Sequence, residues 1–369
     1  MKEDRWVIIL AGGCGERLWP LSTKRRPKHL IPIIRQFQNS LKPLPLKTNH
    51  LKNNTTLLEE TFNRTSQVIP DDRILIVTKK EQYPLIKNCF RKNITIIKEP
   101  IGKNTFPAIL SGVQWIINHS DENQLISVFS ADQFISPLHK FISCILRSFR
   151  YLQNNNNILL WGIKPDRPST NFGYIKTYHN KSRATPSFLD VAGFIEKPDI
   201  KKAKKFISQK NYFFNAGIFF FKANVFLNEA IILYPDLSLL LPKLYTSISS
   251  TAPVLEVYQK FPTISIDYAL LEKIRNLKCL PVNFYWNDVG SLDDFVNLFA
   301  KQTRLITYNS KNIAAYSESG HIISAFNIND IIIIESNGKI FVADRKSLKE
   351  IRGFYKFLST NASVPQSIL

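Results

Sequence analysis

The segment WVIILAGGCGERLWPLSTKRRPKHL, residues 6–30, decides the fold. Its apolar run Trp6–Ala11 predicts a buried strand, and Gly12, Gly13 and Gly15 follow at once, so that backbone N–H groups can approach an anion closely. The segment is not a Walker A loop, because no G-K-[ST] ends it. It is not a dinucleotide-binding fingerprint either, because Arg17–Leu18 stands where the last glycine is expected. An ordinary tight turn is the alternative to a phosphate-binding loop.

Strand and helix signals alternate through the first half of the chain. Apolar runs predict strands, and segments of helical periodicity separate them, which is typical of a parallel sheet covered by helices on both faces. The expected strands are Trp6–Ala11, Arg73–Thr78, Ile94–Lys98, Leu125–Ser130 and Ile158–Gly162, and the expected helices are Leu57–Thr65, Glu81–Phe90, Thr105–Ile117 and Leu138–Leu152. Ligands bind beyond the carboxyl ends of such strands, where most of the glycine, acidic and basic residues lie.

The rest of the chain divides into two parts. Residues Phe172–Ala300 mix strand and helix signals, and a small β-rich segment with a terminal helix at Ser347–Leu358 is expected after Lys301. We therefore predict a large α/β domain over residues 1–300 and a second, small β-rich domain over residues 301–369. Residues Arg35–Asn54 interrupt the pattern and predict a surface excursion of unknown role.

Composition excludes several classes of protein. The 369 residues carry a formal charge of +20, but the lysines are spread along the whole chain, which argues against a nucleic-acid-binding face. The apolar runs are too short to cross a bilayer, so we expect a cytoplasmic protein without membrane contact. The four cysteines form no metal-binding pattern; Cys14 is either reactive or a small residue that fills a turn.

Two acidic residues are candidates for metal binding. Asp132 follows the predicted strand Leu125–Ser130, and Asp288 lies in a polar turn before the predicted helix Ser291–Ala300. Carboxylates from two loops can hold one Mg²⁺ that still binds phosphate oxygens and water. For either aspartate taken alone, a helix cap or a turn is the competing explanation.

Taken together, the motifs resemble those of the sugar-phosphate nucleotidyltransferases. The signature G-G-x-G-x-R-L followed by P-K is present, and RLWPLS (17–22) is similar to the mannose-1-phosphate guanylyltransferase branch. Further matching blocks follow in order: EPIGKNTFPAI (99–109), SADQFI (130–135), NFGYI (171–175), FIEKP (194–198), FNAGIFFF (214–221), SIDYALLEK (265–273) and WNDVGSLDDF (286–295). The resemblance implies an α/β, Rossmann-like (GT-A-like) fold with a mixed, mostly parallel sheet, and a small C-terminal domain resembling a β-helix.

The resemblance also implies roles for individual residues. Arg17 would contact the leaving pyrophosphate and Lys28 the α-phosphate, and Asp132 and Asp288 would bind Mg²⁺. Nucleotide contacts would come from Leu10, Ala11, Gly12, Gly13, Gly15, Glu99, Pro100 and Asn104, and contacts to the sugar phosphate from Gly173, Glu196, Lys197 and Asn215. An N-cap role for Asn104 and an exposed ion pair between Glu196 and Lys197 are the structural alternatives.

The implied reaction is transfer of GMP from GTP to mannose 1-phosphate, with GDP-mannose and pyrophosphate as products. A homodimer is also expected. Ser130 and Gln133 depart from the family's usual P-A-D-H, so another hexose or heptose 1-phosphate, or another nucleoside triphosphate, stays an alternative. A non-catalytic nucleotide-binding or nucleic-acid-binding protein is the third alternative, and retention of Arg17, Lys28 and both aspartates argues against it.

Overall fold

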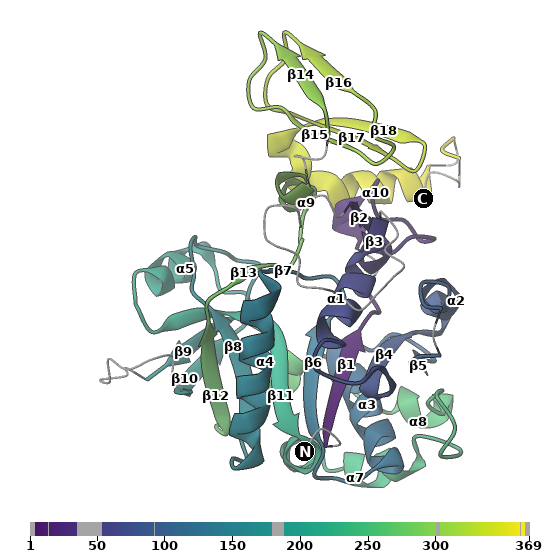
Figure 1. Ribbon diagram of the computed structural model, residues 1–369, viewed down its shortest axis with the longest axis vertical. Helices are drawn as coiled ribbons and strands as arrows, with labels where there is room; N and C mark the ends of the chain where they lie inside the picture. Colours follow the sequence, from purple (N-terminus) through teal and green to yellow (C-terminus); the bar gives the residue numbers. More distant parts are fainter. Residues whose placement is uncertain are drawn as a thin grey trace. The chain divides into compact units, whose positions relative to one another are not determined.

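The computed structural model describes residues 4–13, 15–34, 54–91, 93–178, 188–299, 303–361 and 363–365 (Figure 1). Within it the chain forms two compact units, each assembled from separate stretches of sequence. Unit 1 comprises residues 1–12, 61–131 and 135–286, and unit 2 comprises residues 13–60, 132–134 and 287–369. The glycine-rich segment therefore passes from one unit to the other between Gly12 and Gly13.

Unit 1 is built around a nine-stranded sheet in the part of the chain that the structure describes. The strand order is β5 (Thr95–Glu99), β4 (Ile74–Lys79), β1 (Arg5–Leu10), β6 (Leu125–Ser130), β11 (Tyr212–Lys222), β8 (Ile158–Ile163), β12 (Leu277–Val282), β10 (Leu189–Ile195) and β9 (Tyr174–Thr177). Strands β5, β4, β1 and β6 are parallel, as their uninterrupted apolar runs predict.

The expectation of a mixed, mostly parallel sheet is confirmed for the described residues, because seven of the nine strands run in one direction and only β11 and β10 run against them. Strand β11 is antiparallel to β6, β8 and β9, and β10 is antiparallel to β12 and β9; only β8 and β12 add a further parallel pair. Which strands are reversed could not be predicted, because an apolar run buried on both faces has no alternation that distinguishes strand direction, so the sequence of β11, YFFNAGIFFFK, fits either orientation.

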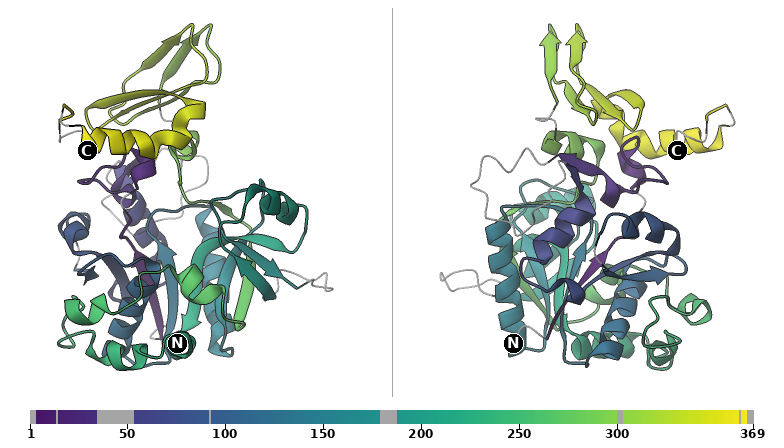
Figure 2. Two further views of the ribbon diagram at one scale, coloured as in Figure 1. Left: turned by 180° about the vertical axis from the view of Figure 1, so that it is seen from behind. Right: turned by 45° about the vertical axis from the view of Figure 1, so that its right-hand side comes forward.

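Helices cover both faces of this sheet (Figure 2). Successive side chains of a strand point to opposite faces. On β1, Ile8 lies against α3 (Thr105–His119) at Gly112, where an added Cβ would come within 2.7 Å of the Ile8 Cδ1 atom. On the other face, the Phe129 ring of β6 contacts Phe141 of α4 (Leu138–Gln153).

The other helices of unit 1 are shorter. They are α2 (Tyr83–Lys87), α5 (Ile200–Ile207), α6 (Ala223–Leu233), α7 (Leu237–Leu240) and α8 (Leu255–Gln259). Three elements lie where the chain passes between the units: α1 (Leu57–Thr65), β7 (Phe134–Ser136) and β13 (Tyr285–Asn287). The predicted strands and helices of the first half are present, with ends that differ by no more than three residues, α2 being shortened by an adjoining 3₁₀ turn over residues 80–82.

Unit 2 combines β2 (Pro32–Ile34) and β3 (Asn54–Thr56) with α9 (Leu292–Phe299) and a β-rich segment, residues 303–361. That segment contains β14 (Leu305–Tyr308), β15 (Ala314–Ser317), β16 (Ile323–Phe326), β17 (Ile331–Ser336), β18 (Lys339–Asp344) and α10 (Ile351–Thr360). Strands β14 and β16, and β15 and β17, pair in parallel at an offset of 18 residues.

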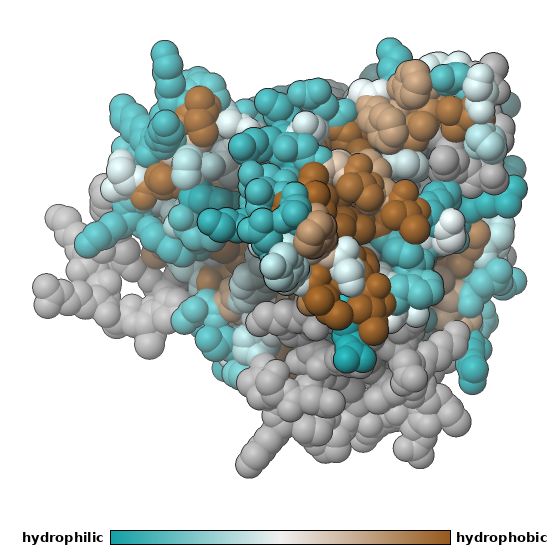
Figure 3. Space-filling model, turned by 90° about the horizontal axis from the view of Figure 1, so that it is seen from above, coloured by the Kyte–Doolittle hydropathy of each residue, from teal (hydrophilic) through white to brown (hydrophobic). Residues whose placement is uncertain are grey.

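Large apolar side chains stay exposed on the β-rich segment (Figure 3). They include Ile306, Tyr308, Ile322, Phe326, Ile340 and Val342. The rings of Tyr308 and Phe326 stack at 5.6 Å between centroids, one residue from each of two paired strands. The paired strands β14 and β16 therefore stabilise each other through solvent-facing side chains as well.

Unit 2 contains residues from both sides of the expected boundary at residue 300. Stretches 13–60 and 132–134 belong with the C-terminal residues because they share a core of Leu18, Trp19, Phe295, Tyr316 and Phe341, among others. The boundary itself falls on residues 300–302, which lie outside the described residues, so that prediction is untested. The same holds for residues 35–53 of the expected excursion and for Cys14. No helix of the described residues is long and apolar enough to span a membrane.

Candidate active site

The expected site residues fall into two groups, one in each unit. Unit 2 contains Gly13, Gly15, Arg17, Lys28, Asp132 and Asp288. Unit 1 contains Leu10, Ala11, Gly12, Glu99, Pro100, Asn104, Gly173, Glu196, Lys197 and Asn215. The residues expected to bind the pyrophosphate, the α-phosphate and Mg²⁺ thus belong to unit 2, and those expected to bind the base and the sugar phosphate belong to unit 1.

In unit 2, Gly15 allows the loop to pack against Lys28. Gly15 has φ of 75°, a conformation that favours glycine, and an added Cβ would collide with the Lys28 side chain and approach its backbone to 3.2 Å. The Gly15 carbonyl accepts hydrogen bonds from Leu18 N at 2.8 Å and Ser22 Oγ at 2.5 Å. Arg17 lies between these contacts, in the 3₁₀ turn Glu16–Leu18. Glycine at position 15 therefore allows the turn that carries Arg17 to start directly against Lys28.

Lys28 joins the two candidate metal-binding aspartates. Its Nζ lies 2.7 Å from Asp132 Oδ2 and also donates to the backbone carbonyl of Asp288. Only 12% of the Lys28 side chain is exposed, so this ion pair is largely shielded from water. The resemblance places these three residues at the phosphates, and the structure places them within one cluster.

The Asp288 carboxyl is electrostatically linked to the rest of this cluster. Burial raises its pKa, and the charge of Asp132 raises it further, whereas Lys28 and Arg17 lower it. The next residue, Val289, has φ of 49°, which is strained for a β-branched side chain. Asn287 Oδ1 accepts a hydrogen bond from Val289 N at 2.6 Å and helps to hold that conformation. Strain of this kind is concentrated at functional sites.

The chemistry of these side chains fits a hard divalent cation. Carboxylate oxygens of Asp132 and Asp288 are the ligands that Mg²⁺ prefers, and Mg²⁺ needs only one or two of them when substrate phosphates complete its shell. Among the described residues no group of three or more histidine, cysteine or acidic side chains is placed to hold a metal. A metal at this cluster would therefore depend on oxygens from the substrates.

In unit 1, the end of β1 lies against a buried acid. An added Cβ at Gly12 would come within 3.6 Å of Glu99 Oε2, and Thr78 Oγ1 donates to the Ala11 carbonyl at 2.7 Å. Burial raises the pKa of Glu99 to about 7, although the hydrogen bond from Tyr258 and the charge of Lys79 lower it. The pKa of this carboxyl, which lies beside the expected nucleotide-binding loop, is therefore close to neutral pH.

Asn104 caps α3, as the structural alternative predicted. Its Oδ1 accepts a hydrogen bond from Thr105 N at 2.8 Å, and its φ is 74°. The residue as a whole is nevertheless exposed, so its role as a cap does not bury it. Pro100, directly after Glu99, is half-buried.

The expected sugar-phosphate residues also converge. The Gly173 carbonyl accepts from Asn215 N at 2.8 Å, and a Cβ at Gly173 would collide with the Glu196 carboxylate. Glu196 pairs with Lys197, whose φ is 45°. Asn215 lies at an irregularity in the pairing of β11 with β8, a distortion that re-aims side chains next to active sites. The ion pair between Glu196 and Lys197, which was the structural alternative, is therefore present, and Glu196 also lies directly against Gly173.

Two residues of unit 1 were missed by sequence reasoning. Asn215 Nδ2 donates to Asp267 Oδ1 at 3.0 Å, and burial and the charge of Glu196 raise the pKa of Asp267 to about 6. Lys79, at the end of β4, has its Cγ 3.9 Å from the position of a Gly12 Cβ. The signal for Asp267 was its place in the block SIDYALLEK; Lys79 stood in one of the strand-end loops.

The basic run 24–26 is not a uniform phosphate-binding patch. Lys24 and Arg25 are exposed, whereas Arg26 Nη1 pairs with Glu318 Oε1 at 2.6 Å. Arg26 is therefore engaged inside unit 2, and Lys28 remains the lysine of this segment that contacts the aspartates.

The profile of the family described as "Nucleotidyl transferase" matches residues 6–304. The chain belongs to the nucleotidyl transferase family. Two curated relatives, each named mannose-1-phosphate guanylyltransferase, come from Salmonella muenchen and Escherichia coli (strain K12). The first is 27% identical over 96% of this chain and 73% of its own length, and the second is 26% identical over 94% and 72%.

A solved structure with the same fold is described as mannose-1-phosphate geranyltransferase from Thermus thermophilus. Its TM-score is 0.80 at 24% identity, and the match covers 97% of this chain and 100% of that one. The fold of this nucleotidyl transferase, including its β-rich C-terminal segment, therefore falls within a known architecture.

Proposed function

We propose that this nucleotidyl transferase transfers GMP from GTP to mannose 1-phosphate. A phosphate oxygen of the sugar phosphate attacks the α-phosphorus of GTP, the bond from that phosphorus to the bridging oxygen breaks, and pyrophosphate leaves. The observation that carries the proposal is the cluster of Lys28, Asp132 and Asp288 in unit 2 of a chain whose relatives bear this name. A phosphate monoester is already a competent nucleophile near neutral pH, so the reaction needs positioning and charge neutralisation more than a general base.

The residues of unit 2 would act on the phosphates. Gly13 and Gly15 present backbone N–H groups, Arg17 binds the departing pyrophosphate, and Lys28 stabilises charge at the α-phosphate. Asp132 and Asp288 would hold Mg²⁺, which supplies positive charge to the phosphate oxygens when it is bound. Lys28 already pairs with Asp132, so it is placed to exchange that carboxylate for a phosphate oxygen.

The residues of unit 1 would select the substrates. Leu10, Ala11 and Gly12 would contact the nucleotide, and Glu99, Pro100 and Asn104 the base and ribose. Gly173, Glu196, Lys197 and Asn215 would bind the sugar phosphate. Asp267 joins this group because it accepts a hydrogen bond from Asn215 and is electrostatically coupled to Glu196.

Three further expectations belong to the same proposal. The parallel pairings at an offset of 18 residues support a β-helix-like arrangement of the C-terminal segment. A homodimer and a cytoplasmic location complete it, with no role for nucleic acid or a membrane. The spread of lysine along the whole chain supports the exclusion of a nucleic-acid surface.

A screen of pyrophosphate release tests the proposal. The purified chain is incubated with Mg²⁺, each of the four nucleoside triphosphates and a set of sugar 1-phosphates that includes mannose, glucose and a heptose. Release that is fastest with GTP and mannose 1-phosphate is expected. A strong preference for another pair would replace the substrates but keep the reaction, whereas no release with any pair would overturn the catalytic function.

A further inference from the structure

Two arginine side chains connect the β-rich segment of unit 2 to the stretches that carry Lys28 and Asp288. Those stretches contain little regular structure of their own. Lys28 begins a single 3₁₀ turn, Lys28–Leu30, and Asp288 lies in the turn before α9. Charged groups on short loops need support from neighbouring residues if they are to keep a productive geometry.

Arg26 lies two residues before Lys28 and uses all three of its nitrogens. Its Nε donates to the Leu21 carbonyl at 3.0 Å, within its own loop. Its Nη1 pairs with Glu318 at 2.6 Å, and its Nη2 donates to Ser336 Oγ at 2.6 Å. Glu318 directly follows β15, and Ser336, which is fully buried, ends the adjacent β17. The guanidinium thus fastens the loop to the ends of two paired strands.

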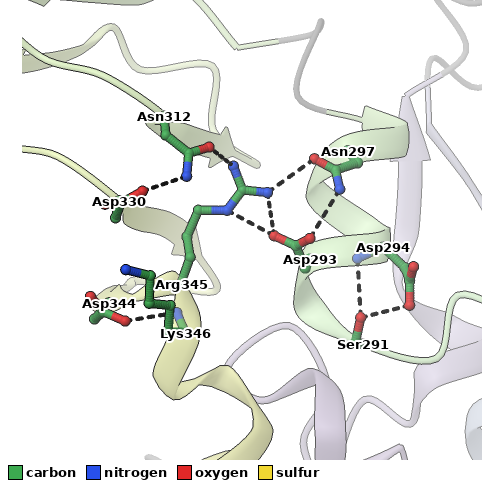
Figure 4. Close-up of polar contacts among 9 residues, drawn as sticks. All are labelled: Ser291, Asp293, Asp294, Asn297, Asn312, Asp330, Asp344, Arg345 and Lys346. Carbon is green, nitrogen blue, oxygen red and sulfur yellow. Dashed lines mark hydrogen bonds and ion pairs between the residues drawn. The ribbon is translucent and has the colours of Figure 1, made fainter. Parts of the chain in front are cut away.

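Arg345 makes the corresponding connection to α9 (Figure 4). Its Nε and Nη2 both donate to Asp293 Oδ1, at 2.9 and 2.5 Å, and its Nη1 donates to Asn312 Oδ1 at 2.7 Å. Asp293 is the second residue of α9 and lies five residues after Asp288. On the far side, Asn312 Nδ2 donates to Asp330, which continues the network into the β-rich segment. Only 19% of the Arg345 side chain is exposed.

Apolar contacts reinforce both connections. Trp19, two residues after Arg17, packs edge-on against Phe341 at 5.5 Å and Phe354 at 5.4 Å between ring centroids. Phe295 of α9 packs edge-on against Tyr316 of β15 at 4.9 Å. The β-rich segment therefore contacts the phosphate loop and α9 through fixed, directional side chains rather than through a loose interface.

We propose that Arg26 and Arg345 are positioning residues of the transfer reaction, because they hold the loop of Lys28 and the helix after Asp288 against the β-rich segment. This inference rests on the proposed function. It assigns residues 303–361 a direct part in arranging Lys28, Asp132 and Asp288. Displacement of reacting groups by about 1 Å can lower a rate by about 10²-fold, so loss of either arginine should be visible in turnover.

The test compares Arg26→Ala, Arg345→Ala and Arg345→Lys with Lys278→Ala. Lys278 is the matched control, because it forms an ion pair of 2.6 Å with Asp190 between strands of unit 1, away from the residues assigned to the reaction. Lysine at position 345 can keep one donor to Asp293 but not the planar fork, so it keeps folding possible if the alanine variant fails to fold. Each variant is measured for kcat, for the KM of both substrates, and for backbone hydrogen exchange.

Both arginine-to-alanine changes should lower kcat by about 10²-fold, with Arg345→Lys in between, while KM changes much less. Exchange should become faster in residues 21–31 for Arg26→Ala and in residues 287–299 for Arg345→Ala. The control should keep its kcat and the exchange of both stretches. Wild-type kcat in the arginine variants, or loss of kcat without faster exchange in these stretches, would overturn the inference. An inactive wild-type chain would instead refute the proposed function.

Discussion

At the scale of the residue, the candidate site consists of charged groups whose neighbours set their protonation and position. Lys28 is held between Asp132 and the Asp288 carbonyl, and Asp288 responds to both Asp132 and Lys28. In unit 1, Glu99 is buried beneath the position of Gly12 and is hydrogen-bonded by Tyr258. Replacing one of these carboxylates by the amide of the same shape should therefore show what its charge contributes.

Asp132→Asn is the simplest such change, because it keeps the shape of the side chain and removes its charge. We expect nucleotidyl transfer to fall on the order of 10²–10³-fold, with little change in thermal stability, since Lys28 can still donate to the amide oxygen. Steady-state rates and thermal unfolding measure both effects. Asp190→Asn, which weakens the ion pair with Lys278, is the matched control. Near-normal turnover in Asp132→Asn would refute the role of this carboxylate.

Glu99 makes stability depend on pH. Its pKa is raised from 4.5 to about 7 because burial disfavours the charged form. The folded state therefore binds the proton more tightly than the unfolded state does, so the stabilising effect is complete below pH 4.5 and is lost as the pH rises through about 7. The shift corresponds to about 3 kcal/mol.

Glu99→Gln should remove this dependence, because the neutral amide can still accept the hydrogen bond from Tyr258. The unfolding free energies of the two proteins are compared at about pH 5 and about pH 8, on either side of the folded-state pKa. We expect wild type to lose more stability than the variant over this interval. Asp267 and His29 also titrate abnormally, but they do so in both proteins and cancel in the comparison. Parallel pH profiles would contradict the assignment to Glu99.

At the scale of the element, close packing between strands fixes the sheet that supports the site. Gly162 on β8 has no room for a side chain, since an added Cβ would lie 2.6 Å from Cys279 Sγ and 2.9 Å from Phe213 Cβ. Cys279 belongs to β12 and Phe213 to β11. A small residue is thus needed where these elements meet.

Gly162→Ala should destabilise the protein by about 1–3 kcal/mol, because the added methyl group would collide with the buried Cys279 thiol and with the Phe213 Cβ atom, which is fixed to the backbone. Gly193→Ala on β10 is the control: nothing lies within 4 Å of its added Cβ, and alanine there should be neutral or slightly stabilising. Denaturant unfolding of both variants measures the difference. Equal stability of the two would show that β11 and β12 yield more readily than their packing indicates.

At the scale of the whole molecule, the net charge of +20 acts on every anionic substrate. A positive protein attracts a triphosphate over distances that salt shortens to about 8 Å at physiological ionic strength. We expect kcat/KM for GTP to fall several-fold as ionic strength rises from low to moderately high, with a smaller change in kcat. Initial rates in sodium chloride and in potassium acetate measure this and separate general screening from chloride binding. A flat profile in both salts would show that the charge contributes nothing to substrate capture.

Much of the candidate site could be predicted from the sequence because its residues stand in short, ordered motifs. Glu99 and Asp132 follow predicted strands, which have a clear apolar signature, whereas Arg17, Lys28 and Asp288 lie in loops and were assigned through the resemblance of their motifs to the family. Asp267 and Lys79 were not predicted as site residues. Tertiary packing brings them near Asn215 and Gly12, and such packing leaves no local pattern in the sequence.

The sequence by itself determined the first parallel strands and their helices, since local periodicity carries that information, and the resemblance of its motifs singled out the glycine-rich segment and the two aspartates as candidate site residues. Only the tertiary structure decided that β11 runs against its neighbours, that Arg26 and Arg345 are bound to Glu318 and Asp293, and that residues 13–60 fold with the C-terminal segment. The physical reason is that these features depend on contacts between residues far apart in the sequence, 310 positions in the case of Arg26 and Ser336, and side chains that meet only after folding impose no periodicity on the chain.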